Sequence, residues 1–127
     1  MQVIYPVCCG IDVHAAQRTT CLRRVSDEGQ ITTALVNCDT TSRELIALRT
    51  WVQAQQCPVA AMECTGVYWK LVSHVLRAAV EVCVANRHEV RQRPGRQTDP
   101  RDATWIAELL AHGLIKPSCV PPPEMRT

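Results

Sequence analysis

The stretch Val3 to Val13, VIYPVCCGIDV, predicts a buried β-strand that carries a carboxylate, Asp12, at its end. A second apolar run, Val59 to Glu63 (VAAME), also ends on a carboxylate. A carboxylate at the end of a buried strand is costly unless it is paired or hydrogen-bonded. The two runs therefore predict a sheet core with acidic groups at one of its edges.

The segments around these runs predict a mixed sheet flanked by helices. Further strands are expected at 14–24, 30–37 and 80–85. Apolar residues at helical spacing predict helices at about 41–55, 65–79 and 99–112. The order β-β-β-α-β-α-β-α, with five strands, indicates an α/β fold of the ribonuclease H-like class, to which RuvC-type nucleases belong.

Length and composition indicate a single globular domain. The chain has 127 residues, of which 46% are apolar and 20% charged, enough for one hydrophobic core. We expect the domain to cover residues 1–120, with the proline-containing segment 121–127 as a tail or the start of a linker. No apolar run approaches the roughly 18 residues that a membrane span needs, so no membrane partner is expected.

The eight cysteines do not have the spacing of a disulfide framework or a zinc site. Cys8 and Cys9 are adjacent, the others are scattered, and no C-x-x-C pair occurs. Free cysteine packs as a small hydrophobic residue. The pattern predicts reduced thiols in the core and a reducing, cytoplasmic compartment.

Two further carboxylates, Asp99 and Asp102, open the last predicted helix and share one of its faces because they are three residues apart. If the strands that carry Asp12 and Glu63 are parallel neighbours, these two side chains lie close together. Hard cations such as Mg²⁺ or Mn²⁺ prefer oxygen ligands, and two-metal cleavage of phosphodiesters needs such carboxylates. The four acidic residues therefore form a candidate metal and catalytic site.

Each carboxylate also has a simpler interpretation. Asp99 and Asp102 could serve as a helix cap and as partners of the helix dipole. Asp12 could end its strand in solvent, and Glu63 could pair with an arginine. The coincidence of four such placements favours the shared site.

A basic stretch lies between the last two predicted elements. It contains five arginines against two acidic residues, Glu89 and Asp99. The arginines are Arg87, Arg91, Arg93, Arg96 and Arg101. The guanidinium group suits phosphate recognition, so the stretch is a candidate nucleic-acid-binding segment. The alternative is a solvated basic loop.

Four motifs follow one another along the chain. They are GIDVH (10–14), MECTGVYW (62–69), NRHEV (86–90) and GRQTDPRDA (95–103). Together they resemble the amino-terminal domain of the DEDD transposases, the family typified by insertion sequence 110, over about Val7 to Pro122. The resemblance implies a RuvC-like domain in which the four acidic residues bind Mg²⁺ and act in DNA strand exchange.

The resemblance also implies partners: DNA, a bridging guide RNA and further copies of the protein in a dimer or tetramer, in a bacterial or archaeal cytoplasm. Two features depart from the family pattern. Gln97 stands where the family commonly has lysine, and the chain stops at Thr127, whereas family members continue into a domain that supplies a catalytic serine. We therefore expect an excised domain or a truncated product that does not complete recombination alone.

Three functional readings follow from the sequence. The first is the Mg²⁺-binding domain of a transposase that acts in DNA strand cleavage and exchange. The second is a truncated nucleic-acid-binding module without catalytic activity, which binds through the segment from Arg87 to Arg101. The third is a stand-alone junction nuclease of the RuvC type.

Overall fold

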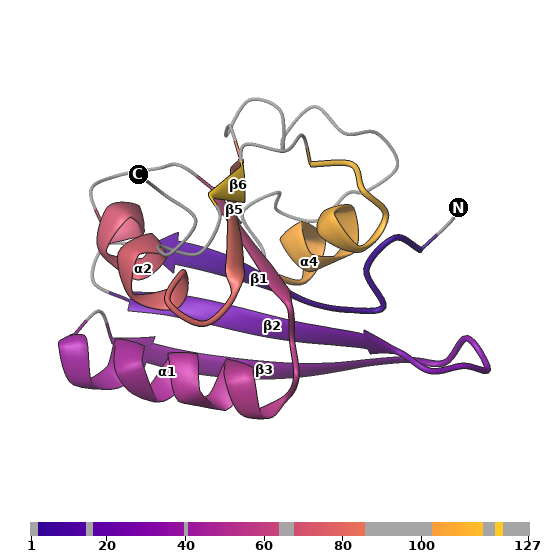
Figure 1. Cartoon of the computed structure of the whole chain (residues 1–127), viewed down its shortest axis with the longest axis horizontal. Helices are drawn as coiled ribbons and strands as arrows, with labels where there is room; N and C mark the ends of the chain where they lie inside the picture. Colours follow the sequence, from indigo (N-terminus) through magenta and orange to yellow (C-terminus); the bar gives the residue numbers. More distant parts are fainter. Residues whose placement is uncertain are drawn as a thin grey trace.

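The computed structural model describes residues 3–14, 17–39, 41–63, 68–85, 103–115 and 119–120. These residues form a sheet with helices against both of its faces (Figure 1). The strands are β1 (Val7–His14), β2 (Gln17–Val25), β3 (Ile31–Asp39), β4 (Val59–Glu63), β5 (Glu81–Ala85) and β6 (Cys119–Val120). The helices are α1 (Ser42–Ala54), α2 (Tyr68–Leu76) and α4 (Ala103–Ala111).

The sheet has the order β3-β2-β1-β4-β5-β6. Strands β1, β2 and β3 form an antiparallel meander, and β4 and β5 then add in parallel beyond β1. The predicted fold class is confirmed, and so is the order of the first eight elements among the residues that the structure describes. The sixth strand was not predicted, because a two-residue strand is too short to produce a periodic sequence pattern.

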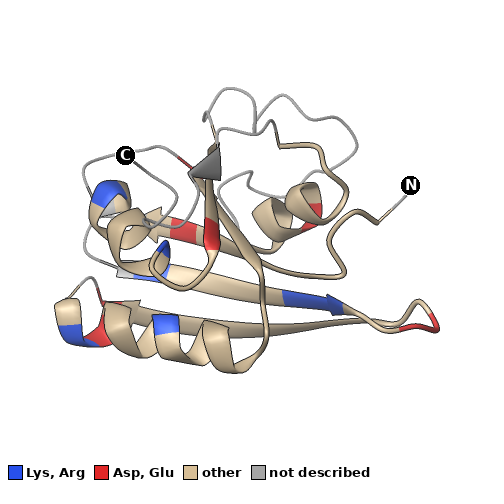
Figure 2. Cartoon of the chain, viewed as in Figure 1, with Lys and Arg blue, Asp and Glu red and all other residues tan. Residues whose placement is uncertain are grey.

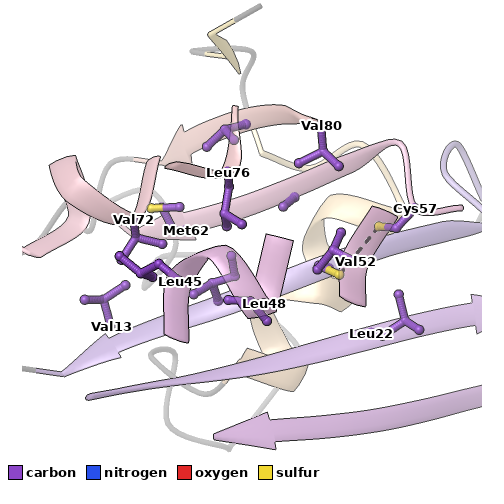
Figure 3. Packing of buried hydrophobic residues seen from close by; sticks show 14 residues of the cluster. Val13, Leu22, Leu45, Leu48, Val52, Cys57, Met62, Val72, Leu76 and Val80 are labelled. Atoms are coloured by element: carbon purple, nitrogen blue, oxygen red, sulfur yellow. Dashed lines mark hydrogen bonds between the residues drawn. The ribbon is translucent and has the colours of Figure 1, made fainter. Parts of the chain in front are cut away.

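Two clusters of buried side chains occupy the two faces of the sheet. On one face, Cys9, Ile11 and Val13 of β1 pack with residues of α1 and α2 (Figure 3). On the other face, Cys8 packs with α4. Because successive strand residues point to opposite faces, Asp12 belongs to the α4 face together with Cys8 and Gly10.

The apolar stripes predicted for the first and last helices are confirmed. Leu45, Leu48 and Val52 of α1 are buried. The buried residues of α4 include the predicted Ala103, Ile106, Ala107 and Leu110, and also Trp105, Leu109 and Ala111. The predicted start of that helix, 99–102, lies outside the described residues.

Some predicted boundaries are wrong. The first strand begins at Val7 and not at Val3, because Ile4 N and Tyr5 N both donate to Ala111 O, at 2.7 and 3.1 Å, and so hold the end of α4. Pro6, between this contact and the strand, has no backbone N–H to donate. The second helix ends at Leu76, ahead of the predicted end at Ala79.

Most described cysteines behave as predicted. Cys8, Cys9, Cys21, Cys38 and Cys57 are not disulfide-bonded. Burial raises the pKa of Cys8 to about 12, so this thiol stays neutral in the core. Cys57 Sγ lies 3.5 Å from Cys9 Sγ (Figure 3), and the hydrogen bond between the two thiols, together with burial, raises the pKa of Cys9.

Cys83 corrects the expectation of fully reduced cysteines, because it is disulfide-bonded. Its Cα is in register with that of Cys119 where β6 pairs with β5. The spacing of the cysteines along the sequence could not predict that β6 would form.

No helix in the described ranges is both long enough and apolar enough to cross a lipid bilayer.

Candidate functional site

The two strand carboxylates lie on neighbouring parallel strands. The register of β1 and β4 pairs Cys9 with Ala60, Gly10 with Ala61 and Ile11 with Met62. One further step along both strands brings Asp12 beside Glu63. This confirms the condition on which the sequence argument depended, that the first and fourth strands are parallel neighbours.

Asp12 and Glu63 also share one face of the sheet. Val59 and Ala61 pack in the cluster that contains α4, whereas Ala60 and Met62 pack with α1 and α2. Glu63, two residues beyond Ala61, therefore belongs to the α4 face, as Asp12 does. The two carboxylates thus come from adjacent strands and from the same side of the sheet.

Helix α4 lies directly on the strand that carries Asp12, and Gly10 is the point of contact. A Cβ atom added to Gly10 would lie 2.3 Å from Ala103 O and 2.4 Å from Ala107 N. The first turn of α4 is therefore seated where β1 has no side chain. Asp12 follows Gly10 by two residues on the same face, about 6.6 Å along the strand.

The two carboxylates differ in their access to solvent. Glu63 is only 3% exposed, whereas Asp12 is partly exposed. The strand continues for two residues beyond Asp12, to His14. Asp12 is therefore not a solvated strand end, and one carboxylate of the pair is buried in the core while the other is partly exposed.

The donor set fits a hard divalent cation but is only half described. Asp12 and Glu63 supply carboxylate oxygens, the ligands that Mg²⁺ and Mn²⁺ prefer. Among the described residues, no group of three or more His, Cys, Asp or Glu side chains could hold a metal ion. The other two predicted ligands, Asp99 and Asp102, lie outside these residues.

The predicted nucleic-acid-binding arginines also lie outside the described residues. They are Arg87, Arg91, Arg93, Arg96 and Arg101. Their role stays a prediction from the sequence.

Sequence reasoning missed the role of Gly10. The residue was noted as part of a motif, but its contact with a helix more than 90 residues later could not be read from spacing. The available signal was a glycine inside a strand pattern, which often marks a close approach of another backbone.

The chain was compared with known proteins. The sequence model of a transposase family, the DEDD transposases typified by insertion sequence 110, matches residues 9–127. The chain belongs to this family. The matched range includes all four predicted acidic ligands and the basic stretch of this transposase-family chain. Among curated protein sequences, none matches it.

Solved structures confirm the fold of this transposase-family chain. Thermus thermophilus RuvC is similar with a TM-score of 0.58 and 14% identity, over 87% of this chain and 99% of RuvC. A structure of T. thermophilus RuvC in complex with a Holliday junction substrate also has a TM-score of 0.58, with 13% identity, over 85% of this chain and 93% of that one. The fold is therefore RuvC-like and ribonuclease H-like.

Proposed function

We propose that this chain is the metal-binding domain of a DNA transposase, in which Asp12, Glu63, Asp99 and Asp102 hold Mg²⁺ or Mn²⁺ for DNA strand cleavage and exchange. The observation that carries the proposal is the placement of Asp12 and Glu63 on adjacent parallel strands and on the same face, beside the seat of α4 on Gly10. Membership of the transposase family supports the same function.

Chain connectivity supports a contribution from the two aspartates that precede α4. Ala103 lies over Gly10, and Asp102 is joined to Ala103 by one peptide unit. Because consecutive Cα atoms are about 3.8 Å apart, this sequence neighbour of Ala103 is a candidate ligand beside Asp12. Asp99, three residues earlier, shares a helix face with Asp102 if the helix extends to it.

The described carboxylates have distinct tasks in this proposal. Glu63, buried at the end of β4, provides a fixed ligand whose position is set by the core around it. Asp12, partly exposed, provides a ligand on the side from which a phosphodiester can approach. A bound divalent cation supplies Lewis-acid activation of the phosphate and of the attacking oxygen.

The remaining parts of the proposal rest on the family and on similarity. DNA is the proposed substrate. One of the similar structures, T. thermophilus RuvC, is in complex with a Holliday junction substrate, which supports this proposal. The arginines from Arg87 to Arg101 are proposed to contact phosphates. A bridging guide RNA, assembly as a dimer or tetramer, a domain over residues 1–120 and a cytoplasmic location belong to the same proposal.

Metal binding is tested by thermal unfolding with and without Mn²⁺ or Mg²⁺. At a metal concentration of 100 times Kd, we expect the native chain to gain about 2.7 kcal/mol of stability. Asp12→Asn removes one charged ligand with little change in shape, so it should abolish most of this gain. Calorimetric titration should show the same loss of binding.

Asp27→Asn, at the exposed β2–β3 turn, is the matched control and should keep the full metal response. The proposed metal site is refuted if the native chain shows no metal-dependent shift, or if Asp12→Asn shifts as much as the control.

The alternative function, a nucleic-acid-binding module without catalysis, is tested with the basic stretch. Replacing Arg91, Arg93 and Arg96 by glutamine should lower DNA affinity and reduce the slope of log K against log salt by about 2 to 3, because each lost phosphate contact removes about 0.9. Arg43→Gln, at an exposed arginine of α1, should change the slope by less than about 1.

The two functions separate when metal dependence is added. In the alternative, Asp12→Asn leaves DNA affinity unchanged and no metal-dependent cleavage of branched or duplex DNA occurs. If the triple arginine variant bound DNA with unchanged affinity, the basic stretch would not be the DNA-binding segment in either of the two functions.

A further inference from the structure

Strand β3 forms an edge of the sheet without the usual protection against pairing. It is the terminal strand next to β2, and its nine residues pair with β2 in unbroken register from Val25–Ile31 to Gln17–Asp39. From Ile31 to Cys38 the sequence ITTALVNC contains no charge and no proline. Native edge strands are commonly protected by charges, prolines or bulges, and β3 has none of these over eight residues.

The hydrogen bonds at the β2–β3 turn show which backbone groups of β3 face outward. Val25 N donates to Pro6 O at 2.8 Å, on the β1 side of β2, and Ser26 N donates to Gln30 O at 2.9 Å. The Val25–Ile31 pair is therefore not hydrogen-bonded, and the pairs alternate from there along the ladder. The N–H and C=O groups of Ile31, Thr33, Leu35 and Asn37 thus point away from β2, toward the open edge.

The side chains of the same residues add exposed apolar surface. Leu35 is 60% exposed and Ile31 is 56% exposed, and their even separation puts both on one face of the sheet. Thr19 Oγ1 and Asn37 Oδ1, 2.7 Å apart, lie on that face as well. One set of alternate residues therefore offers both unpaired backbone groups and apolar contacts.

We propose that β3 pairs in antiparallel orientation with β3 of a second copy of this chain, about a two-fold axis at Leu35. Leu35 then pairs with Leu35 of the partner subunit, and Thr33 pairs with Asn37 of the partner subunit. Residues whose numbers sum to 70 are opposite one another, so the odd-numbered residues, which have the outward backbone groups, pair with each other. The strand is complementary to itself because this register opposes no like charges between Ile31 and Asp39.

Charged residues lie beyond both ends of the neutral stretch (Figure 2). The β2–β3 turn carries the exposed Asp27 and Glu28, and the other end has the exposed Asp39, with Arg43 and Glu44 at the start of α1. Both ends are acidic on balance, so the pairing rests on the backbone groups and the apolar side chains of the strand. This interface does not depend on the proposed metal site.

Sedimentation equilibrium of the native chain tests the interface. We expect a monomer–dimer equilibrium, and we expect Leu35→Lys to raise the dimer dissociation constant at least about tenfold, because two like charges then face each other directly across the axis. Leu71→Lys is the matched control, since Leu71 is also exposed (40%) but lies on α2. A native chain that stays monomeric overturns the proposal, and so does a Leu35→Lys dimer as tight as the control.

Amide hydrogen exchange tests whether the open edge of β3 forms the dimer contact. Raising the protein concentration should slow exchange at Thr33, Leu35 and Asn37, and leave Thr32, Ala34 and Val36 unchanged because β2 already binds them. Concentration-dependent protection without this alternation would place the dimer contact elsewhere and overturn the proposal.

Discussion

Gly10→Ala is expected to lower the free energy of unfolding by about 3 kcal/mol or more, because the added methyl group overlaps backbone atoms of α4. The overlapping atoms are Ala103 O and Ala107 N, at 2.3 and 2.4 Å from the ideal Cβ position. A backbone contact of this kind cannot be relieved by a change of rotamer, so the helix must move away from β1. Thermal unfolding should show a melting temperature lower by about 10 °C or more.

Gly29→Ala is the matched control, because the same methyl group would have no neighbour within 4 Å. Gly29 has a φ of +86°, so alanine there costs about 1 kcal/mol of backbone strain and no packing. If Gly10→Ala costs no more than Gly29→Ala, α4 is not seated on β1 as described.

Ile106→Ala is expected to cost about 3 kcal/mol, as large truncations in a close-packed core do. Ile106 is fully buried in the cluster between α4 and the sheet. The cavity would loosen the helix that follows Asp102, so the metal-dependent stabilisation should also shrink. Chemical denaturation with and without Mn²⁺ measures both effects.

Ile46→Ala is its control, since Ile46 lies on α1 and is 46% exposed. We expect a change within about 0.5 kcal/mol and an unchanged metal response. Equal costs at the two positions would contradict the burial of α4. A large cost at Ile106 with a full metal response would show that α4 does not position the site.

The sequence was sufficient for the features that depend on periodicity. Alternation and helical spacing predicted the meander, the following strands and the buried stripes of α1 and α4, and β4 has the predicted bounds, Val59 to Glu63. The placement of Asp12 and Glu63 on strands followed from two apolar runs that each lead to a carboxylate, although β1 continues beyond Asp12 to His14. Their adjacency required the strand order, which only the structure supplies.

Other features depend on contacts between distant segments and left little trace in local sequence. The seat of α4 on Gly10, the late start of β1 and the disulfide at Cys83 each arise where two segments meet. Gly10 has no side chain, so its chemistry gives no sign in the sequence of the contact with α4. Asp99, Asp102 and the basic arginines lie outside the described residues, so for them the sequence remains the source of the proposal.

The contact of residues 4 and 5 with Ala111 has a consequence for how the site is held. Helix α4 is bound at its first turn by Gly10 and at its last residue by the segment that leads into β1. Helix α4 is therefore held against β1 at both of its ends, which restricts the rotation of the helix relative to the strand. Asp12 on the strand and Ala103 at the start of the helix keep their spacing through these contacts, so α4 holds its position on β1 by interactions within the chain itself.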